Sequence, residues 1–134
     1  MLNVLDARRA ADLRCDGIMI TNHGGRELDG CVSPIDVLPE IAQAVGDRLA
    51  VIADSGFHRG TDVLKAIAPG ARAVMIGRPT LYGLAAGGEA GVRHALSLLT
   101  SDRALGQLRC RSLAEVGPHL LARHDAGMPA TPRA

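Results

Sequence analysis

The sequence predicts an α/β fold built on a parallel sheet, and three observations support this class. Three short aliphatic runs, residues 17–20, 49–53 and 73–76, do not alternate with polar residues, which is typical of strands buried on both faces. Helical patterns separate these runs, and alternating helices and strands indicate right-handed βαβ units. Each run ends directly in a polar loop that contains glycine: NHGGR, DSGFHRG and GRP.

Two helices are expected on either side of the first strand. The first is rich in alanine and arginine and covers residues 6–13. The second begins after Ser33, a favourable N-cap residue, with Pro34 at the first helical position. We expect this second helix to run to Val45 and to stop at Gly46.

Two further helices are expected on either side of the third strand. Thr61 and Asp62 open a short helix over residues 63–68, and Pro69 ends it because proline has no N–H to continue the ladder. A longer helix covers roughly residues 81–99. The predicted order is therefore helix, strand, helix, strand, helix, strand and helix.

The end of the chain is expected to add one more helix. Ser112 and Glu115 have the spacing of a capping box, which predicts a helix near residues 113–123. The tail from about residue 125 is expected to be frayed. A chain of 134 residues holds one core but not two ordinary domains, so residues 1–134 are expected to form one unit.

Composition excludes several classes of function. The formal net charge of +1 does not favour a nucleic-acid or acidic membrane partner, and Phe57 and Tyr82 are the only aromatic residues. No apolar run approaches the roughly 20 residues of a membrane-spanning helix. Three widely spaced cysteines, Cys15, Cys31 and Cys110, form no disulfide pattern, which favours reduced thiols in a cytoplasmic protein.

The loops distinguish between two parallel architectures. An open doubly wound sheet and a (β/α)8 barrel both fit the alternation of helices and strands. Reactive side chains just past the carboxyl ends of successive strands are typical of the barrel. No GxGxxG motif follows the first strand, which weakens a dinucleotide-binding interpretation. The sequence therefore favours part of a barrel.

The second and third loops together predict a phosphate site. Gly56 and Gly77 expose backbone amides, and His58, Arg59 and Arg78 add positive charge. Loops after the last two strands of such barrels often bind phosphate, assisted by a helix N-terminus. The alternative for either loop alone is a turn with solvated arginines, but two such loops on consecutive strands favour phosphate binding.

The first loop suggests a base beside a carboxylate clamp. His23 can take up a proton near neutral pH, and Arg26 can grip a carboxylate with two hydrogen bonds. Such a pair suits proton removal next to the carboxylate. The alternative is a histidine bonded to backbone, with Arg26 paired to Glu27 or Asp29, and this stretch alone favours the alternative. No histidine has the spacing of a metal ligand.

Four ordered segments carry a family resemblance. NHGGRELDG, SPIDVLPEI, ADSGFHRGTDVLKAI and AVMIGRPTLYGLAAGGEAGV resemble the FMN-dependent α-hydroxy-acid dehydrogenases and oxidases, which include glycolate oxidase, L-lactate dehydrogenase and mandelate dehydrogenase. The resemblance covers about residues 5–123. It implies a (β/α)8 barrel whose sixth to eighth strands lie here, FMN as cofactor, and oxidation of a small 2-hydroxy acid to the 2-oxo acid.

The resemblance also implies roles for individual residues. His23 matches the active-site base, and Arg26 matches the arginine that holds the substrate carboxylate. The positions that match the flavin-binding segments are Asp54, Ser55, Gly56, His58, Arg59, Gly77 and Arg78. His58 stands where the family has the first of two arginines, which leaves Arg59 as the second.

The resemblance implies that the first five βα units of the barrel are absent from these residues. We therefore expect the chain to be the C-terminal portion of a barrel, with little or no turnover by itself. Its expected partners are a small 2-hydroxy acid and either another chain that supplies the missing strands or further copies of itself. The alternatives are a non-catalytic remnant with weak FMN or phosphate binding, or a different phosphate-binding barrel enzyme.

Overall fold

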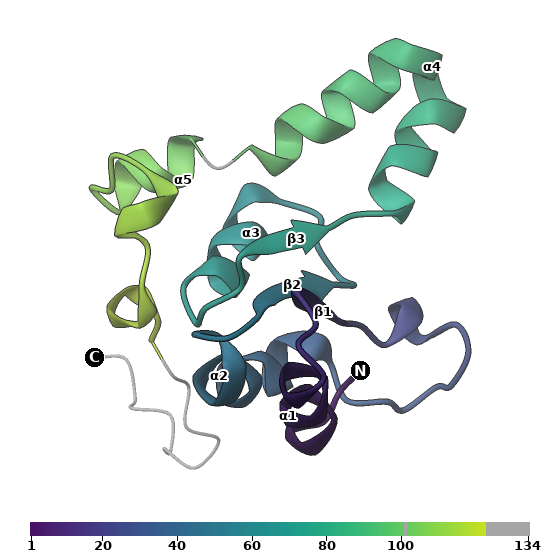
Figure 1. Ribbon diagram of the computed structural model, residues 1–134. Coiled ribbons are helices and arrows are strands. Elements are labelled where there is room, and N and C mark those ends of the chain that lie inside the picture. Colours follow the sequence, from purple (N-terminus) through teal and green to yellow (C-terminus); the bar gives the residue numbers. More distant parts are fainter. Residues whose placement is uncertain (101, 123–134) are drawn as a thin grey trace, which may run out of the picture.

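Three parallel strands form the centre of the molecule. The computed structural model describes residues 1–100 and 102–122. Strands β1 (Gly17–Ile20), β2 (Ala50–Asp54) and β3 (Ala73–Met75) pair in the order β1-β2-β3 (Figure 1). The predicted parallel α/β sheet is confirmed, and the strand ends differ from the predicted ones by at most one residue.

Three helices alternate with these strands and cover one face of the sheet. They are α1 (Val4–Asp12), α2 (Pro34–Val45) and α3 (Gly60–Ile67). Helix α1 packs on α2 and β1, α2 packs on β2, and α3 packs on β3. The core lies between these helices and the sheet, and its largest fully buried side chains are Ile20, Leu38, Ile41, Val45, Val51 and Pro34.

The helix starts follow from local hydrogen bonds. The side chain of Asn3 accepts from the backbone N–H groups of the first turn of α1, so this helix begins before residue 6. Helix α2 has the predicted bounds, although the Ser33 side chain makes no capping bond. Helix α3 begins at Gly60, since the Asp62 carboxylate accepts from the backbone N–H of Arg59 at 3.0 Å.

The second face of the sheet is not covered by the described residues. Along β1 and β2 the buried side chains alternate with more exposed ones. Met19 and Met75 are 37% and 47% exposed, and Ile52, which pairs with Met19, is half-buried. The expectation of strands buried on both faces is therefore wrong for these residues, because helices lie on only one side. In a complete barrel this inner face meets the side chains of the other strands.

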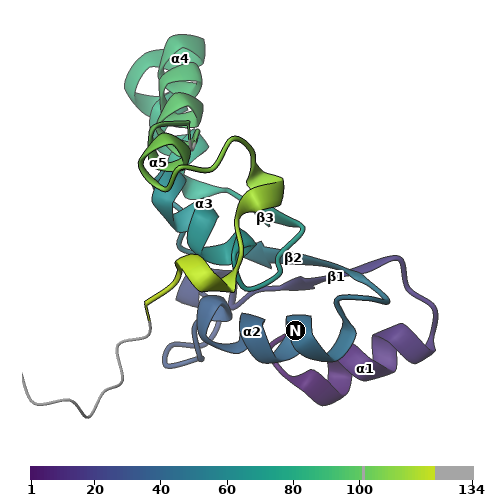
Figure 2. The same ribbon diagram turned by 90° about the vertical axis from the view of Figure 1, so that its left-hand side faces the viewer.

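Helix α4 (Arg78–Leu99) leaves the sheet and bends (Figures 1 and 2). Its kink lies at Gly87 and Gly88, where Gly88 has a φ of 56°. The two halves approach so closely at Gly83 and Gly91 that an added Cβ on either residue would overlap the backbone of the other. One continuous helix over residues 81–99 was too simple a prediction, because two glycines in succession permit the break.

The predicted last helix over residues 113–123 is wrong. The chain forms two short 3₁₀ turns instead, η2 (Leu113–Glu115) and η3 (Pro118–Leu120). Val116 and Gly117 between the two turns have extended backbone, and a glycine followed by a proline disfavours the helical conformation at this point. Residue 123 and the tail expected to be frayed lie outside the described residues.

The capping box expected for that helix does not form. The Ser112 side chain makes no capping bond. Glu115 accepts instead from the backbone N–H of Arg111 at 2.9 Å and from its guanidinium Nε at 3.1 Å. A short helix that the sequence did not predict, α5 (Asp102–Gln107), precedes this region. In the part of the chain that is described, no helix has both the length and the apolar character to cross a membrane.

Candidate functional site

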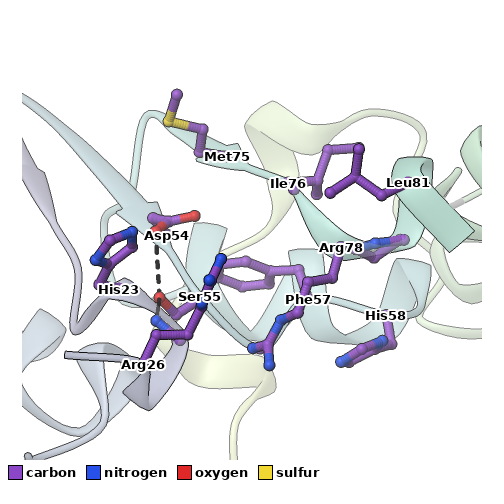
Figure 3. A pocket seen from close by; sticks show the side chains of 14 residues that line it. His23, Arg26, Asp54, Ser55, Phe57, His58, Met75, Ile76, Arg78 and Leu81 are labelled. Atoms are coloured by element: carbon purple, nitrogen blue, oxygen red, sulfur yellow. Dashed lines mark hydrogen bonds between the residues drawn. The ribbon is translucent and has the colours of Figure 1, made fainter. Parts of the chain in front are cut away.

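The loops at the carboxyl ends of all three strands open into one cavity of about 190 Å³ (Figure 3). Parallel strands place their carboxyl ends at the same edge of a sheet, so residues far apart in the chain meet here. The cavity is lined by His23, Gly24, Arg26, Asp54, Ser55, Gly56, Phe57, His58, Met75, Ile76, Gly77, Arg78, Pro79 and Leu81. The predicted base, clamp and phosphate-binding loops therefore share one site.

A left-handed turn follows β1 and shapes the first loop. His23, Gly24 and Gly25 have φ values of 57°, 66° and 76°. This region of backbone conformation favours glycine, so the Gly-Gly pair permits a turn that few other residues would tolerate. Within the turn Gly24 also lies against Arg78, since an added Cβ would be 2.7 Å from a guanidinium nitrogen. Glycine at position 24 thus lets the first and third loops pack together.

Hydrogen bonds join the first loop to the second. Thr21 Oγ1 donates to Asp54 Oδ2 at 2.6 Å, and Ser55 Oγ donates to the same oxygen at 3.2 Å. The backbone N–H of Gly24 donates to Ser55 Oγ at 3.1 Å. Ser55 has a φ of 81°, which is unusual for a residue with a side chain. Its hydroxyl bridges two loops, which explains a serine at a position where glycine would be less strained.

His23 and Arg26 line the cavity and are both exposed. His23 Nδ1 lies 3.5 Å from Glu27 Oε1, and the two side chains are 65% and 75% exposed. Arg26 makes no ion pair within residues 1–100 and 102–122. The alternative pairing of Arg26 with Glu27 or Asp29 is therefore not what the structure shows. A guanidinium that lines the same cavity as an imidazole is suited to holding a carboxylate.

The residues that line the cavity from the second and third loops suit an anion. Gly56 has a φ of 90°, and Gly77 precedes the first residue of α4. Arg78 and His58 line the same space, so guanidinium, imidazole and a helix N-terminus all face it. These groups favour a phosphate by charge and by hydrogen bonding. The donor set fits the phosphate end of FMN.

Arg59 is the one predicted cofactor residue that does not line this cavity. It borders an adjoining groove with Thr61, Ser97 and Arg103. Its backbone N–H is bound to the Asp62 carboxylate at the start of α3. His58 lines both the cavity and this groove, whereas Arg59 lines only the groove of the two, which their adjacent places in the sequence could not show.

Thr21 was missed by the sequence analysis. The residue directly follows β1 and is half-buried, and its hydroxyl reaches both the second loop and the first. A polar residue at the first position after a buried strand was the available signal. Phe57 was noted only as one of two aromatic residues, yet it is 6% exposed and forms part of the cavity wall.

Comparisons with known proteins show the family of the chain. The model of the FMN-dependent dehydrogenase family matches residues 1–123. L-lactate oxidase from Nostoc sp. is 47% identical over 118 residues, which are 87% of this chain and 32% of that protein. (S)-mandelate dehydrogenase from Pseudomonas putida is 46% identical over 123 residues, which are 90% and 31% of the two chains.

A solved structure also matches this chain, in fold as well as in sequence. A crystal structure of mandelate oxidase with 3,3-difluoro-2-hydroxy-3-phenylpropionic acid superimposes with a TM-score of 0.82 at 47% identity, covering 87% of this chain and 36% of that one. The chain belongs to the FMN-dependent dehydrogenase family, an oxidoreductase family with FMN as cofactor, and its fold is part of a (β/α)8 barrel. It spans about a third of the length of the curated relatives it matches.

Proposed function

We propose that this chain supplies the base, the substrate clamp and the flavin phosphate site of an enzyme that oxidises a small 2-hydroxy acid to the 2-oxo acid. One observation carries the proposal: His23 and Arg26 line the same cavity as Gly77 and Arg78. A base and an arginine that binds a carboxylate fit a 2-hydroxy acid, and the anion site in the same cavity fits the phosphate of a flavin nucleotide. The whole set of groups therefore fits the two ligands together better than it fits either one alone.

The described residues fit part of FMN. Arg78, His58 and the amides near Gly56 and Gly77 would hold the phosphate. Asp54 would accept from ribityl hydroxyls, because Oδ2 is held by Thr21 and Ser55 whereas Oδ1 has no partner within residues 1–100 and 102–122. The cavity of about 190 Å³ is smaller than the roughly 300–1,000 Å³ of complete ligand pockets, so other polypeptide would complete the site.

The positions of Arg26 and His23 in the cavity support a role for each in oxidising the substrate. Oxidation of a 2-hydroxy acid removes two electrons and two protons, and FMN when bound supplies the electron acceptor. Arg26 would bind the substrate carboxylate with two hydrogen bonds and so fix the orientation of the carbon that bears the hydroxyl. His23 would take a proton from that substrate as a general base. The two electrons and the second proton would go to FMN when it is bound, so the oxidation balances.

Completion of the barrel is part of the proposal. The described sheet leaves β1 and β3 as edges and leaves Met19, Ile52 and Met75 uncovered on its inner face. We propose that these residues form the C-terminal portion of a barrel whose other strands come from further polypeptide. Exposed edges and apolar faces favour such pairing. By itself the chain would then have little or no turnover.

The compartment is proposed from the cysteines. Cys15, Cys31 and Cys110 are all free thiols in the structure. Free thiols suit a reducing compartment. We therefore propose the cytoplasm.

Flavin binding and reduction test the proposal. The chain is purified with FMN, titrated by flavin fluorescence, and mixed with L-lactate or L-mandelate in the absence of oxygen. We expect bound flavin, weaker binding in Arg78→Ala, and unchanged binding in Arg72→Ala, which removes an exposed charge outside the cavity. Bleaching should appear only when the remaining strands are supplied. Failure to bind FMN would overturn the proposal and favour a remnant without cofactor.

A further inference from the structure

Thr21 forms a bridge between two loops of the site. Its hydroxyl donates to Asp54 Oδ2 at 2.6 Å and accepts from the backbone N–H of His23 at 3.0 Å. The first bond is short and has an ionised acceptor, which makes it one of the stronger kinds of hydrogen bond. A single hydroxyl thus connects the carboxylate in the second loop to the backbone of the residue in the position of the base.

His23 needs such support because of its backbone. With a φ of 57° it lies in the left-handed region, which residues with a Cβ rarely occupy. The two residues that follow are glycines and add no side-chain constraint of their own. The imidazole is 65% exposed, so packing against the core does not fix it either. The hydrogen bond to its N–H therefore restrains the backbone from which the imidazole projects, and Glu27 Oε1, 3.5 Å from Nδ1, is the ion-pair partner of the ring itself.

The neighbouring amide is held in a similar way. The backbone N–H of Gly24 is shared between Asn22 Oδ1 at 3.0 Å and Ser55 Oγ at 3.1 Å. Ser55 in turn donates to Asp54. Both amides at the start of the turn are thus linked to the same carboxylate, His23 through Thr21 and Gly24 through Ser55.

We propose that Thr21 is a positioning residue for His23, acting through its hydroxyl rather than through its bulk. The role rests on the proposed function in that His23 is taken as the base. The competing explanation is that Thr21 only fills space at the end of β1. Valine has nearly the same shape as threonine but no hydroxyl, whereas serine keeps the hydroxyl and loses the methyl group, so the two explanations make opposite predictions.

The test compares Thr21→Val with Thr21→Ser in the 134-residue chain by NMR. We expect solvent exchange of the His23 amide to rise roughly fivefold in Thr21→Val, the factor for loss of one typical hydrogen bond. In Thr21→Ser the rate should stay within about twofold of the parent. The amide of Val51, in the central strand β2, reports whether the fold is intact and should be unchanged in both variants.

A second readout follows the imidazole itself. The ring signals of His23 should shift in Thr21→Val and return in Thr21→Ser, while those of His94 and His119, exposed and outside the cavity, stay in place. Unchanged His23 signals in Thr21→Val, or equal changes in both variants, would overturn the inference. Neither readout uses FMN, so a chain that binds no flavin but shows this pattern would refute the proposed function and leave the positioning role standing.

Discussion

Replacing Gly24 with alanine tests whether the first and third loops pack together as the structure shows. Gly24 has a φ of 66°, and an added Cβ would lie 2.7 Å from a guanidinium nitrogen of Arg78. Real side chains do not approach so closely, so the guanidinium would have to move out of its place in the cavity. Gly25 is the matched control, because its φ is 76° but an added Cβ would meet nothing within 4 Å.

The expected changes in Tm and in FMN affinity distinguish backbone strain at the glycine from displacement of the Arg78 guanidinium. A left-handed residue with a Cβ costs roughly 1–2 kcal/mol, so both variants should lose that stability, which lowers the Tm by roughly 3–10 °C. Displacing the end of a flexible arginine adds little to this cost. It does remove a charged hydrogen bond of about 1.5–3 kcal/mol from the anion site, so Gly24→Ala should bind FMN at least about tenfold more weakly than Gly25→Ala.

The assay is thermal unfolding followed by fluorescence titration with FMN for the parent chain and both variants. Similar losses of Tm with different dissociation constants for FMN would support the packing of Gly24 on Arg78. Equal dissociation constants for the two variants would refute it, since only position 24 can disturb the guanidinium.

Three other substitutions test separate parts of the structure. His58→Arg should tighten FMN binding about fivefold or more, because a guanidinium carries a permanent charge and binds phosphate with two hydrogen bonds; an unchanged affinity would mean that residue 58 does not reach the phosphate. Gly91→Ala should lower the Tm, since its methyl group would meet the backbone of Gly83 and force the halves of α4 apart. Leu38→Ala should cost about 2–5 kcal/mol in chemical denaturation, because Leu38 is fully buried, whereas Leu5→Ala, at a site 73% exposed, should cost far less.

The sequence predicted the strands and their loops well because those signals are local. Aliphatic runs without alternation marked β1, β2 and β3, and the residue types after each run indicated which loops carried chemistry. The bounds of α2 followed from Pro34 and from Gly46 at its end. Near the end of the chain, two local signals favoured different structures, and the helix predicted from one of them does not form. Ser112 and Glu115 favoured a helix, whereas Gly117 followed by Pro118 favours the extended backbone that interrupts it.

Most of the candidate site could likewise be predicted, but its geometry could not. His23, Arg26, Gly77 and Arg78 were chosen from their places after strands, and the structure brings them to one cavity. Their roles as base, clamp and phosphate ligands stay predictions. Arg59 has the same residue type as Arg78 and a neighbouring loop, yet it faces another groove. Side-chain direction depends on the backbone around each residue, which residue type does not specify.

The sequence by itself determined the class of fold, the order of its elements and the residues available at one edge of the sheet. Hydrophobic periodicity and turn chemistry act over a few neighbouring residues, so they can be read from the chain. Only the tertiary structure decided that Arg78 packs on Gly24 and that Thr21 reaches Asp54. These contacts join loops after different strands, and they exist because parallel pairing brings the strand ends together within hydrogen-bonding distance.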